Sequence, residues 1–275
     1  MSVCDPDEGM HSLFAGSLPH QIIADLPVDA GSRARFEALL DAQAGEIAGV
    51  MTEPLVQGAG GMKFHSPETL QAMREACDAR GLPLIFDEIM TGFGRLGTLF
   101  AAGKAGVTPD IMTVSKALTG GTLPLAAAIA SKQIFNAFWS DQASAALMHG
   151  PTYMGNPAAC AAANASLDLF EREPRLQQVA AIERAFARLL PAARDIPGVI
   201  DVRWQGAIGV IEMAGLPDLD SLKAEFVESG IWVRPFNNII YLMPPFVIGD
   251  SDLEILINTC LGVTRRWAGR HFAGL

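Results

Sequence analysis

The sequence has few cysteines and no long apolar run, which argues against two classes of protein. Only four of its 275 residues are cysteines, and none forms a CxxC pair or clusters with the five histidines at metal-ligand spacing. All four are therefore expected to be buried, reduced thiols, and the absence of a signal-peptide pattern favours the cytoplasm. No uninterrupted stretch reaches the roughly 18 apolar residues of a membrane span, so no membrane protein is predicted.

Positive charge is also scarce. The chain carries 20 lysines and arginines against 30 aspartates and glutamates, a formal net charge of -10. Binding to nucleic acid or to an anionic membrane needs a basic face that neutralises phosphates, so neither is expected as a partner. A small anionic ligand needs only a few local cations and remains open.

Apolar residues make up 50% of the chain and predict a globular protein. In the first half, short apolar runs alternate with helical stretches, which is typical of a mainly parallel α/β sheet. The predicted strands cover residues 47–52, 83–87, 111–114 and 125–130. A helix is expected over 66–80, with Ser66 as its cap, Pro67 at its first position and Gly81 at its end. The strands are apolar on both faces, as expected for a sheet covered by helices on both sides.

The second half has a different pattern. It predicts helices over 156–172, 175–190, 218–229 and 250–267, and hairpins over 199–213 and 231–243. The second hairpin is expected to turn at Asn237-Asn238, and the last helix to be capped by Asp250. Mixed strands and helices indicate a separate α+β domain. The predicted organisation is a large α/β domain over 1–170 and a small domain over 171–275.

Two ionisable residues are predicted at the carboxyl ends of strands, where ligands bind in open α/β sheets. Asp87 closes the run LIFD, and Lys116 follows IMTVS. A lysine that forms a Schiff base and a carboxylate that keeps a pyridine nitrogen protonated are what pyridoxal phosphate (PLP) requires. Taken alone, Asp87 also fits a helix-capping or loop acid, and Lys116 a solvated surface lysine.

Longer motifs favour the PLP interpretation. FDEIMTGFGRLG (86–97), SKALTGGTLPLAA (115–127) and EPLVQGAGG (53–61) resemble, in this order, the class III aminotransferases of PLP fold type I. Further blocks resemble the diaminopelargonate aminotransferase branch of that family; they cover residues 1–14, 148–167, 206–213 and 231–246. The resemblance extends from residue 1 to about 260, and ordered, separated blocks are more specific than any single motif.

The resemblance implies roles for individual residues. Lys116 is expected to bind the cofactor covalently and to move a proton, Asp87 to pair with the pyridine nitrogen, and Ile89 to pack on the ring. Arg234 is expected to bind the substrate carboxylate through two parallel hydrogen bonds from its planar guanidinium group. Its apolar neighbours are expected to shield this position.

The loop HGPT (149–152) is a second group of implied site residues. Pro151 and Thr152 are assigned to cofactor binding, with Thr152 reaching the PLP phosphate of a second subunit, and Gly150 is assigned to substrate binding. This arrangement implies a homodimer with shared active sites. His149 is expected to be structural, Glu53 to lie near the site, and the Gly58–Gly61 loop is not interpreted as a phosphate cradle.

The implied reaction is the PLP-dependent conversion of the keto acid 8-amino-7-oxononanoate to 7,8-diaminononanoate in biotin synthesis, with S-adenosylmethionine as amino donor. Whole enzymes of this kind have a substantial N-terminal part, with a phosphate-binding loop and aromatic residues, before the block at 1–14. Two alternatives stay open. One is another class III enzyme that acts on ω-amino acids or diamines, and the other is a non-catalytic remnant.

Overall fold

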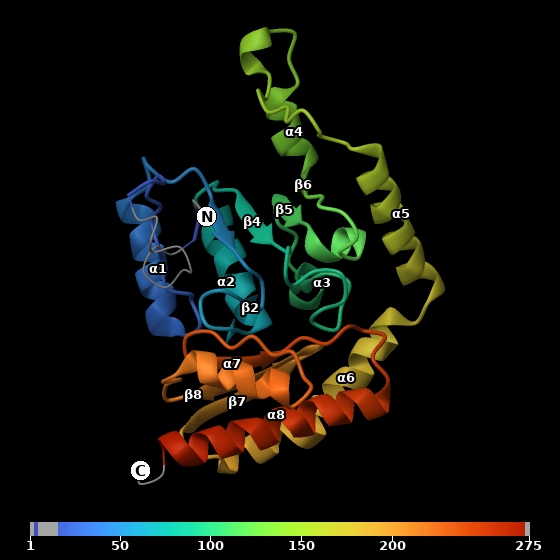
Figure 1. Cartoon of the computed structure of the whole chain (residues 1–275). Helices are drawn as coiled ribbons and strands as arrows, with labels where there is room; N and C mark the ends of the chain where they lie inside the picture. Colours follow the sequence, from blue (N-terminus) through green and yellow to red (C-terminus); the bar gives the residue numbers. More distant parts are fainter. Residues whose placement is uncertain (1–2, 5–15, 273–275) are drawn as a thin grey trace. The chain divides into compact units, whose positions relative to one another are not determined.

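The computed structural model describes residues 3–4 and 16–272, which form two compact units (Figure 1). The first unit contains the described residues up to Phe93, together with Phe100–Arg172. The second contains Gly94–Leu99 and the described residues from Glu173 onward. The block at 1–14, used above for the family resemblance, lies outside the described residues except for 3–4.

A four-stranded sheet organises the first unit, in the order β1-β4-β5-β6. Its strands are β1 Val50–Thr52, β4 Leu84–Asp87, β5 Ile111–Val114 and β6 Ala127–Ala130. β1, β4 and β5 are parallel, and β6 runs antiparallel to β5. The four predicted strands and the mainly parallel sheet are therefore confirmed, although each strand except β5 is shorter than predicted.

Helices and a small hairpin complete this unit. The helices are α1 Ala30–Ala42, α2 Pro67–Asp78, α3 Ala101–Ala105, α4 Lys132–Phe138 and α5 Pro157–Arg172, with short 3-10 turns at Lys116–Thr119 and Ala143–Ala145. β2 Val56–Gln57 and β3 Lys63–Phe64 pair with each other. The predicted helices at 66–80 and 156–172 are confirmed, whereas α1, α3 and α4 were not predicted. Ser66 occupies the cap position of α2, but its side chain makes no capping hydrogen bond.

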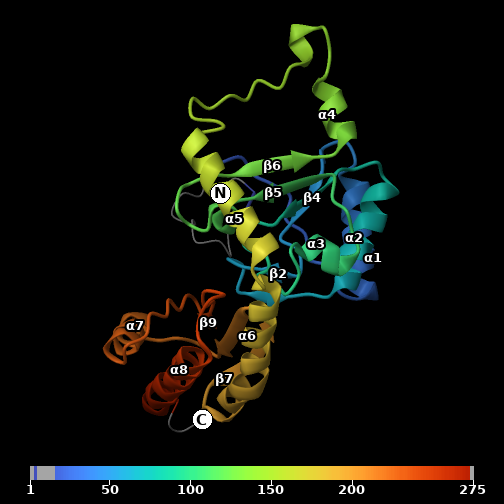
Figure 2. The same cartoon turned by 90° about the vertical axis from the view of Figure 1, so that its right-hand side faces the viewer.

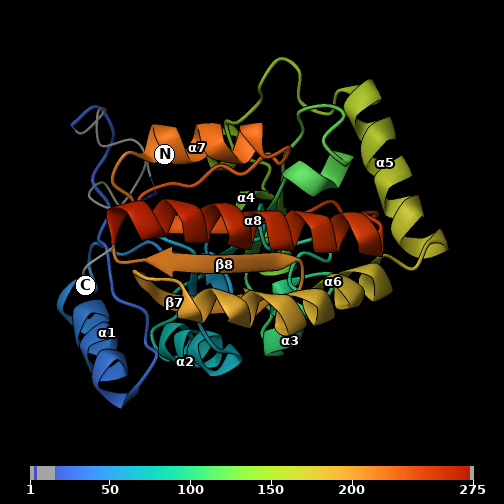
Figure 3. The ribbon, with the colours of Figure 1, turned by 60° about the horizontal axis from the view of Figure 1, so that its bottom comes forward.

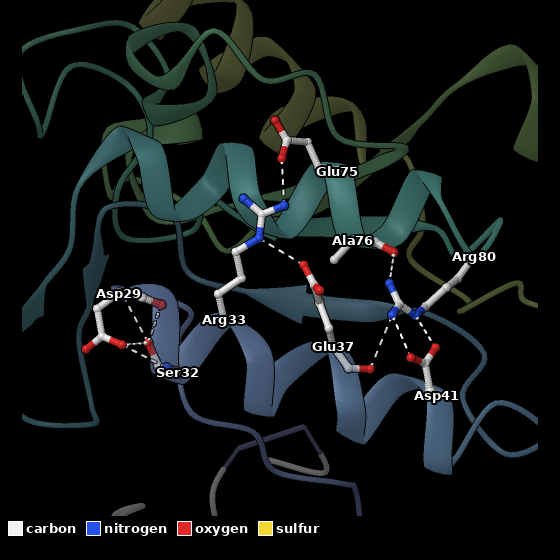
Figure 4. Close-up of polar contacts among 8 residues, drawn as sticks. All are labelled: Asp29, Ser32, Arg33, Glu37, Asp41, Glu75, Ala76 and Arg80. Carbon is white, nitrogen blue, oxygen red and sulfur yellow. Dashed lines mark hydrogen bonds and ion pairs between the residues drawn. The ribbon is translucent and has the colours of Figure 1, made fainter.

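Ion pairs join α1 to α2 on the surface (Figure 4). Arg33 contacts Glu37 of its own helix at 2.9 Å and Glu75 of α2 at 2.8 Å. Arg80, just beyond α2, contacts Asp41 of α1 at 2.7 Å. Because exposed ion pairs contribute little, these contacts add only modestly to the stability of the unit.

The two faces of the sheet differ. Leu84, Phe86 and Val114 are buried on one face, whereas Ile85 and Ile111 on the other are only half-buried. All four residues of β6 are exposed. The prediction of a sheet covered on both faces is therefore wrong for this chain. In the part of the chain that the structure describes, β6 is an edge strand, and the residues after it extend away from the sheet (Figure 2).

A three-stranded antiparallel sheet forms the second unit, in the order β7-β8-β9. Its strands are β7 Val199–Gln205, β8 Ile208–Met213 and β9 Ile239–Leu242, and its helices are α6 Arg175–Leu189, α7 Leu219–Glu228 and α8 Asp250–His271, with a 3-10 turn at Leu190–Asp195. α6 and α8 lie side by side over the sheet (Figure 3). Phe186, Phe226 and Trp267 are fully buried between these layers and form the centre of the core.

Two local predictions for this unit are wrong. The predicted turn at Asn237-Asn238 is present, since Phe236 and Ile239 exchange two backbone hydrogen bonds across it. The prediction of two paired strands over 231–243 is wrong, because only Ile239–Leu242 is a strand and it pairs with β8. Pro235 lacks the N–H group that a paired strand needs, which explains why the preceding stretch stays irregular. The cap of α8 is Gly249, and Asp250 is the first residue of the helix.

Candidate active site at the strand ends

Three ionisable residues follow three neighbouring parallel strands of the first unit. Glu53 follows β1, Asp87 ends β4, and Lys116 follows β5 by two residues. Since these strands are adjacent and parallel, their carboxyl ends meet at one edge of the sheet. The structure thus brings Asp87 and Lys116 to neighbouring strand ends.

Asp87 is half-buried and held in place by the chain that follows it. Its Oδ1 atom accepts a hydrogen bond from the backbone N–H of Ile89 at 2.9 Å. Ile89 is also half-buried, two residues beyond the strand end. The carboxylate therefore has a fixed orientation at the edge of the sheet.

Lys116 has an unusual backbone conformation. Its φ angle is 45°, in the left-handed region that few residues other than glycine adopt. It starts the 3-10 turn Lys116–Thr119, and its side chain is exposed. Ser115, just before it, donates a hydrogen bond to the carbonyl of Leu125 at 2.7 Å and so ties this turn to the next segment. Strained residues of this kind cluster at functional sites.

Glu53 lies near both residues, as expected from the sequence. Its Oε2 atom accepts a hydrogen bond from the N–H of Gly58 at 2.9 Å. Burial is the main cause that raises the pKa of Glu53. The negative charge of Asp87 raises this pKa further, whereas the positive charge of Lys116 lowers it. A Cβ atom on Gly58 would lie 2.6 Å from the sulfur of Met90, so a larger residue here would require the Met90 side chain to move.

Glu88 was not predicted as a site residue, although it follows Asp87 directly. It is fully buried, and its carboxylate accepts hydrogen bonds from the N–H groups of Ala101 and Ala102 at 3.1 and 2.8 Å. The hydroxyl of Thr91 donates a third bond at 2.8 Å. Burial is the main cause that raises the pKa of Glu88. Glu88 therefore attaches the start of α3 to the segment that carries Asp87.

The loop 149–152 is exposed throughout, including Gly150, Pro151 and Thr152. His149, expected to be structural, is exposed with them. Nothing within the first unit therefore shows what Thr152 binds, and its role stays a prediction.

Arg234 lies in the second unit and is exposed, together with Trp232, while Val233 between them is buried. The expectation that apolar neighbours shield Arg234 is wrong for this chain. Alternation along an extended segment explains the difference, because residues two apart point to the same side and Val233 takes the inner side.

Arg95 is a half-buried cation of the second unit that the sequence patterns did not single out. Its guanidinium donates to the carbonyls of Ala207 and Pro244 at 3.3 and 3.0 Å and lies 4.4 Å from the ring centre of Phe246. Burial lowers its pKa to about 10. A glycine at position 206 is required, since a Cβ there would lie 2.4 Å from the Arg95 carbonyl.

The other predictions from composition have mixed outcomes. Cys77 and Cys260 are buried, but Cys4 is exposed and Cys160 only half-buried, so the expectation of four buried thiols is wrong. Among residues 3–4 and 16–272, no group of His, Cys, Asp or Glu side chains is arranged to hold a metal. None of the helices in the same ranges is both long and apolar enough to span a membrane.

Comparison with known proteins establishes the family. Residues 1–261 match the model of the family described as Aminotransferase class-III. The chain belongs to this class-III aminotransferase family. A curated relative from Mycobacterium leprae, named adenosylmethionine-8-amino-7-oxononanoate aminotransferase, is 48% identical over 267 residues, which are 96% of this chain and 61% of the relative.

Solved class-III structures confirm the predicted fold. The adenosylmethionine-8-amino-7-oxononanoate aminotransferase from Methanocaldococcus jannaschii matches with a TM-score of 0.85 and 29% identity, covering 93% of this chain and 62% of that one. An amine transaminase from an uncultivated Pseudomonas species, solved in a PLP-bound form, matches with a TM-score of 0.77 and 30% identity, covering 86% of this chain and 57% of that one. The chain is thus a PLP-transferase fold of type I with a partial large domain, and it spans less than two thirds of these relatives.

Proposed function

We propose that this chain carries the PLP-dependent aminotransferase activity that converts 8-amino-7-oxononanoate to 7,8-diaminononanoate, with S-adenosylmethionine as amino donor, in the cytoplasm. The observation that supports the chemistry is the pairing of Asp87 and Lys116 at neighbouring strand ends. The names and identities of the curated relatives support the substrate.

The residues present fit PLP. Lys116 offers an exposed amine on a strained turn, and Asp87 offers a carboxylate held at the next strand end. These are the two groups that the aldehyde and the pyridine nitrogen require. Ile89, close to Asp87, would pack on the ring. When bound, PLP supplies an electron-withdrawing ring.

Each residue then has a separate task. The Lys116 amine holds the cofactor covalently and, once released, moves a proton at the substrate carbon. Asp87 keeps the pyridine nitrogen protonated through a charge-assisted hydrogen bond. Pro151 and Thr152 would contact the phosphate of a second subunit, Gly150 would border the substrate, and Arg234 would bind its carboxylate.

A homodimer is part of this proposal, and an exposed arm at residues 131–154, which follows the exposed strand β6, supports it. Both views of the first unit show this arm extending away from the sheet (Figures 1 and 2). Large apolar side chains on β6 and along the arm are exposed, namely Ile129 of β6 and Phe135, Phe138, Trp139, Leu147, Met148, Tyr153 and Met154 of the arm. Exposed apolar patches of this kind mark interaction sites. We propose that a second copy of the chain covers this patch, next to Thr152.

We expect the purified chain to sediment as a dimer and the Trp139→Asp variant to sediment largely as a monomer, because a carboxylate cannot be buried unpaired in an apolar interface. Trp232→Asp is the matched control, since Trp232 is 77% exposed and Trp139 75% exposed, but Trp232 lies outside the arm. A monomeric parent chain, or the same effect from both variants, would contradict the dimer proposal.

Turnover tests the proposed reaction directly. The chain is incubated with PLP, 8-amino-7-oxononanoate and S-adenosylmethionine, and 7,8-diaminononanoate is measured. Product that requires both PLP and the donor is the expected result. A folded chain that forms none would overturn the proposal, and activity only on other ω-amino acids or diamines would favour another class-III enzyme.

Arg234→Ala is expected to raise KM for the keto acid about 10- to 100-fold with a smaller change in kcat, because a charged hydrogen bond contributes about 1.5–3 kcal/mol. Arg234→Lys keeps the positive charge but loses the planar guanidinium that makes two parallel hydrogen bonds, so its affinity for the keto acid should lie between those of Arg234→Ala and the parent chain. An unchanged KM in Arg234→Ala would remove this residue from the substrate site.

A further inference from the structure

Asp87 has an aligned neighbour on each side. In the sheet, Asp87 is the register partner of Thr113 on β5, and Thr52 of β1 is the register partner of Phe86. The pairing of β1 with β4 ends there, and Glu53 and Asp87 are the next residues along the two chains. Register partners in parallel strands point to the same face and lie about 4.8 Å apart. Asp87 and Thr113 are such partners, and Glu53 directly follows β1 beside them; these three residues are here called the strand-end row.

Glu53 is fixed in this row from several directions. Gly58 donates its N–H to the side chain at 2.9 Å, and the ring nitrogen Nε2 of His65 lies 3.1 Å from the Glu53 carbonyl. The backbone N–H of His65 donates a hydrogen bond to the carbonyl of Leu55 at 3.0 Å. Leu55 has a φ angle of 67°, in the left-handed region, which a residue other than glycine keeps only where the surrounding turn imposes it. The Gly58 N–H therefore holds the Glu53 carboxyl, and the His65 ring holds the Glu53 backbone.

Two adjacent carboxyls in a partly buried site do not both ionise readily. Burial and the charge of Asp87 raise the pKa of Glu53, while the Gly58 N–H and Lys116 lower it, and the result is a raised pKa. His65 contacts only the backbone carbonyl among the Glu53 atoms, and burial lowers its pKa, so it adds no positive charge at neutral pH. Burial and the neighbouring carboxylate therefore both favour the protonated form of Glu53.

We propose that Glu53 is a positioning residue of the cofactor site. Its carboxyl stays neutral while that of Asp87 is ionised, so the negative charge of the pair lies on Asp87. This inference rests on the proposed function, because it explains how Asp87 remains a carboxylate for the pyridine nitrogen. On its other side, the hydroxyl of Thr113 is buried and has no hydrogen-bond partner among the described residues. Asp87 is thus flanked by two uncharged groups.

The test is a carboxyl NMR titration of the whole chain without cofactor, using ¹³C-labelled glutamate. The Glu53 signal is identified by its loss in Glu53→Gln, and exposed Glu46, identified through Glu46→Gln, is the control. We expect Glu53 to titrate above Glu46, and Asp87→Asn to lower the Glu53 midpoint by at least about half a pH unit, since it removes the neighbouring charge. A Glu53 midpoint no higher than that of Glu46, or one that Asp87→Asn leaves in place, would overturn the proposal.

Cofactor retention provides a second readout. Glu53→Gln mimics the neutral acid and should retain PLP within about threefold of the parent chain, whereas Glu53→Ala should weaken retention about tenfold, the effect of one lost hydrogen bond. Equal loss in both variants would show that the ionised form is needed and would overturn the proposal. If the parent chain retains no PLP, the proposed function fails, and the titration still decides the state of Glu53.

Discussion

Lys116→Ala is expected to abolish transamination, with a loss of at least about 10³-fold in kcat/KM. The variant removes both the amine that would hold the cofactor and the base that would move the proton, and acid–base catalysis alone contributes about 10²–10⁴-fold. The measurement is single-turnover formation of the aminated product with saturating PLP.

A matched lysine separates this effect from a general loss of positive charge. Lys104→Ala, at an exposed position of the same unit, should keep the parent activity. Lys116→Arg keeps the charge but cannot form the covalent link, so it should be as inactive as Lys116→Ala. Substantial residual activity in either Lys116 variant would refute the assignment of this residue.

Glu88→Ala is expected to destabilise the first unit by about 3 kcal/mol. Its carboxylate accepts hydrogen bonds from two backbone N–H groups at the start of α3 and from Thr91, all in a buried position. Each buried donor left without a partner costs about 1–3 kcal/mol. Denaturant unfolding, followed by circular dichroism, measures the change.

The control for this prediction is Glu88→Gln, which keeps a side-chain oxygen that can accept hydrogen bonds from the backbone N–H groups at the start of α3. It should cost about 1 kcal/mol, the range of a weakened hydrogen bond. If Glu88→Ala and Glu88→Gln destabilise the unit equally, the charge and not the set of hydrogen bonds would be the important property.

The strands and the two central site residues could be predicted from the sequence. Apolar runs of strand length predicted β1, β4, β5 and β6 close to their observed positions, because burial in a sheet leaves a strong local pattern. The rule that ligands gather at carboxyl ends then placed Asp87 and Lys116 together. Both steps depend only on local sequence and on strand order.

Tertiary context explains the rest. The roles of Glu88 and Arg95 come from partners that lie far along the chain, such as Ala101 for Glu88 and Pro244 for Arg95, so no local pattern marks them. The exposure of β6 was also unpredictable, since its apolar sequence matches a buried strand and only the arrangement of the described chain leaves it uncovered.

Covalent capture of PLP by this chain is the most direct test of the account. The purified protein is incubated with PLP, excess cofactor is removed, the absorbance spectrum is recorded, and the sample is reduced with borohydride and mapped by peptide mass. We expect a retained visible band and a pyridoxyl adduct on Lys116. A folded chain with no retained band, or with the adduct on another lysine, would contradict it.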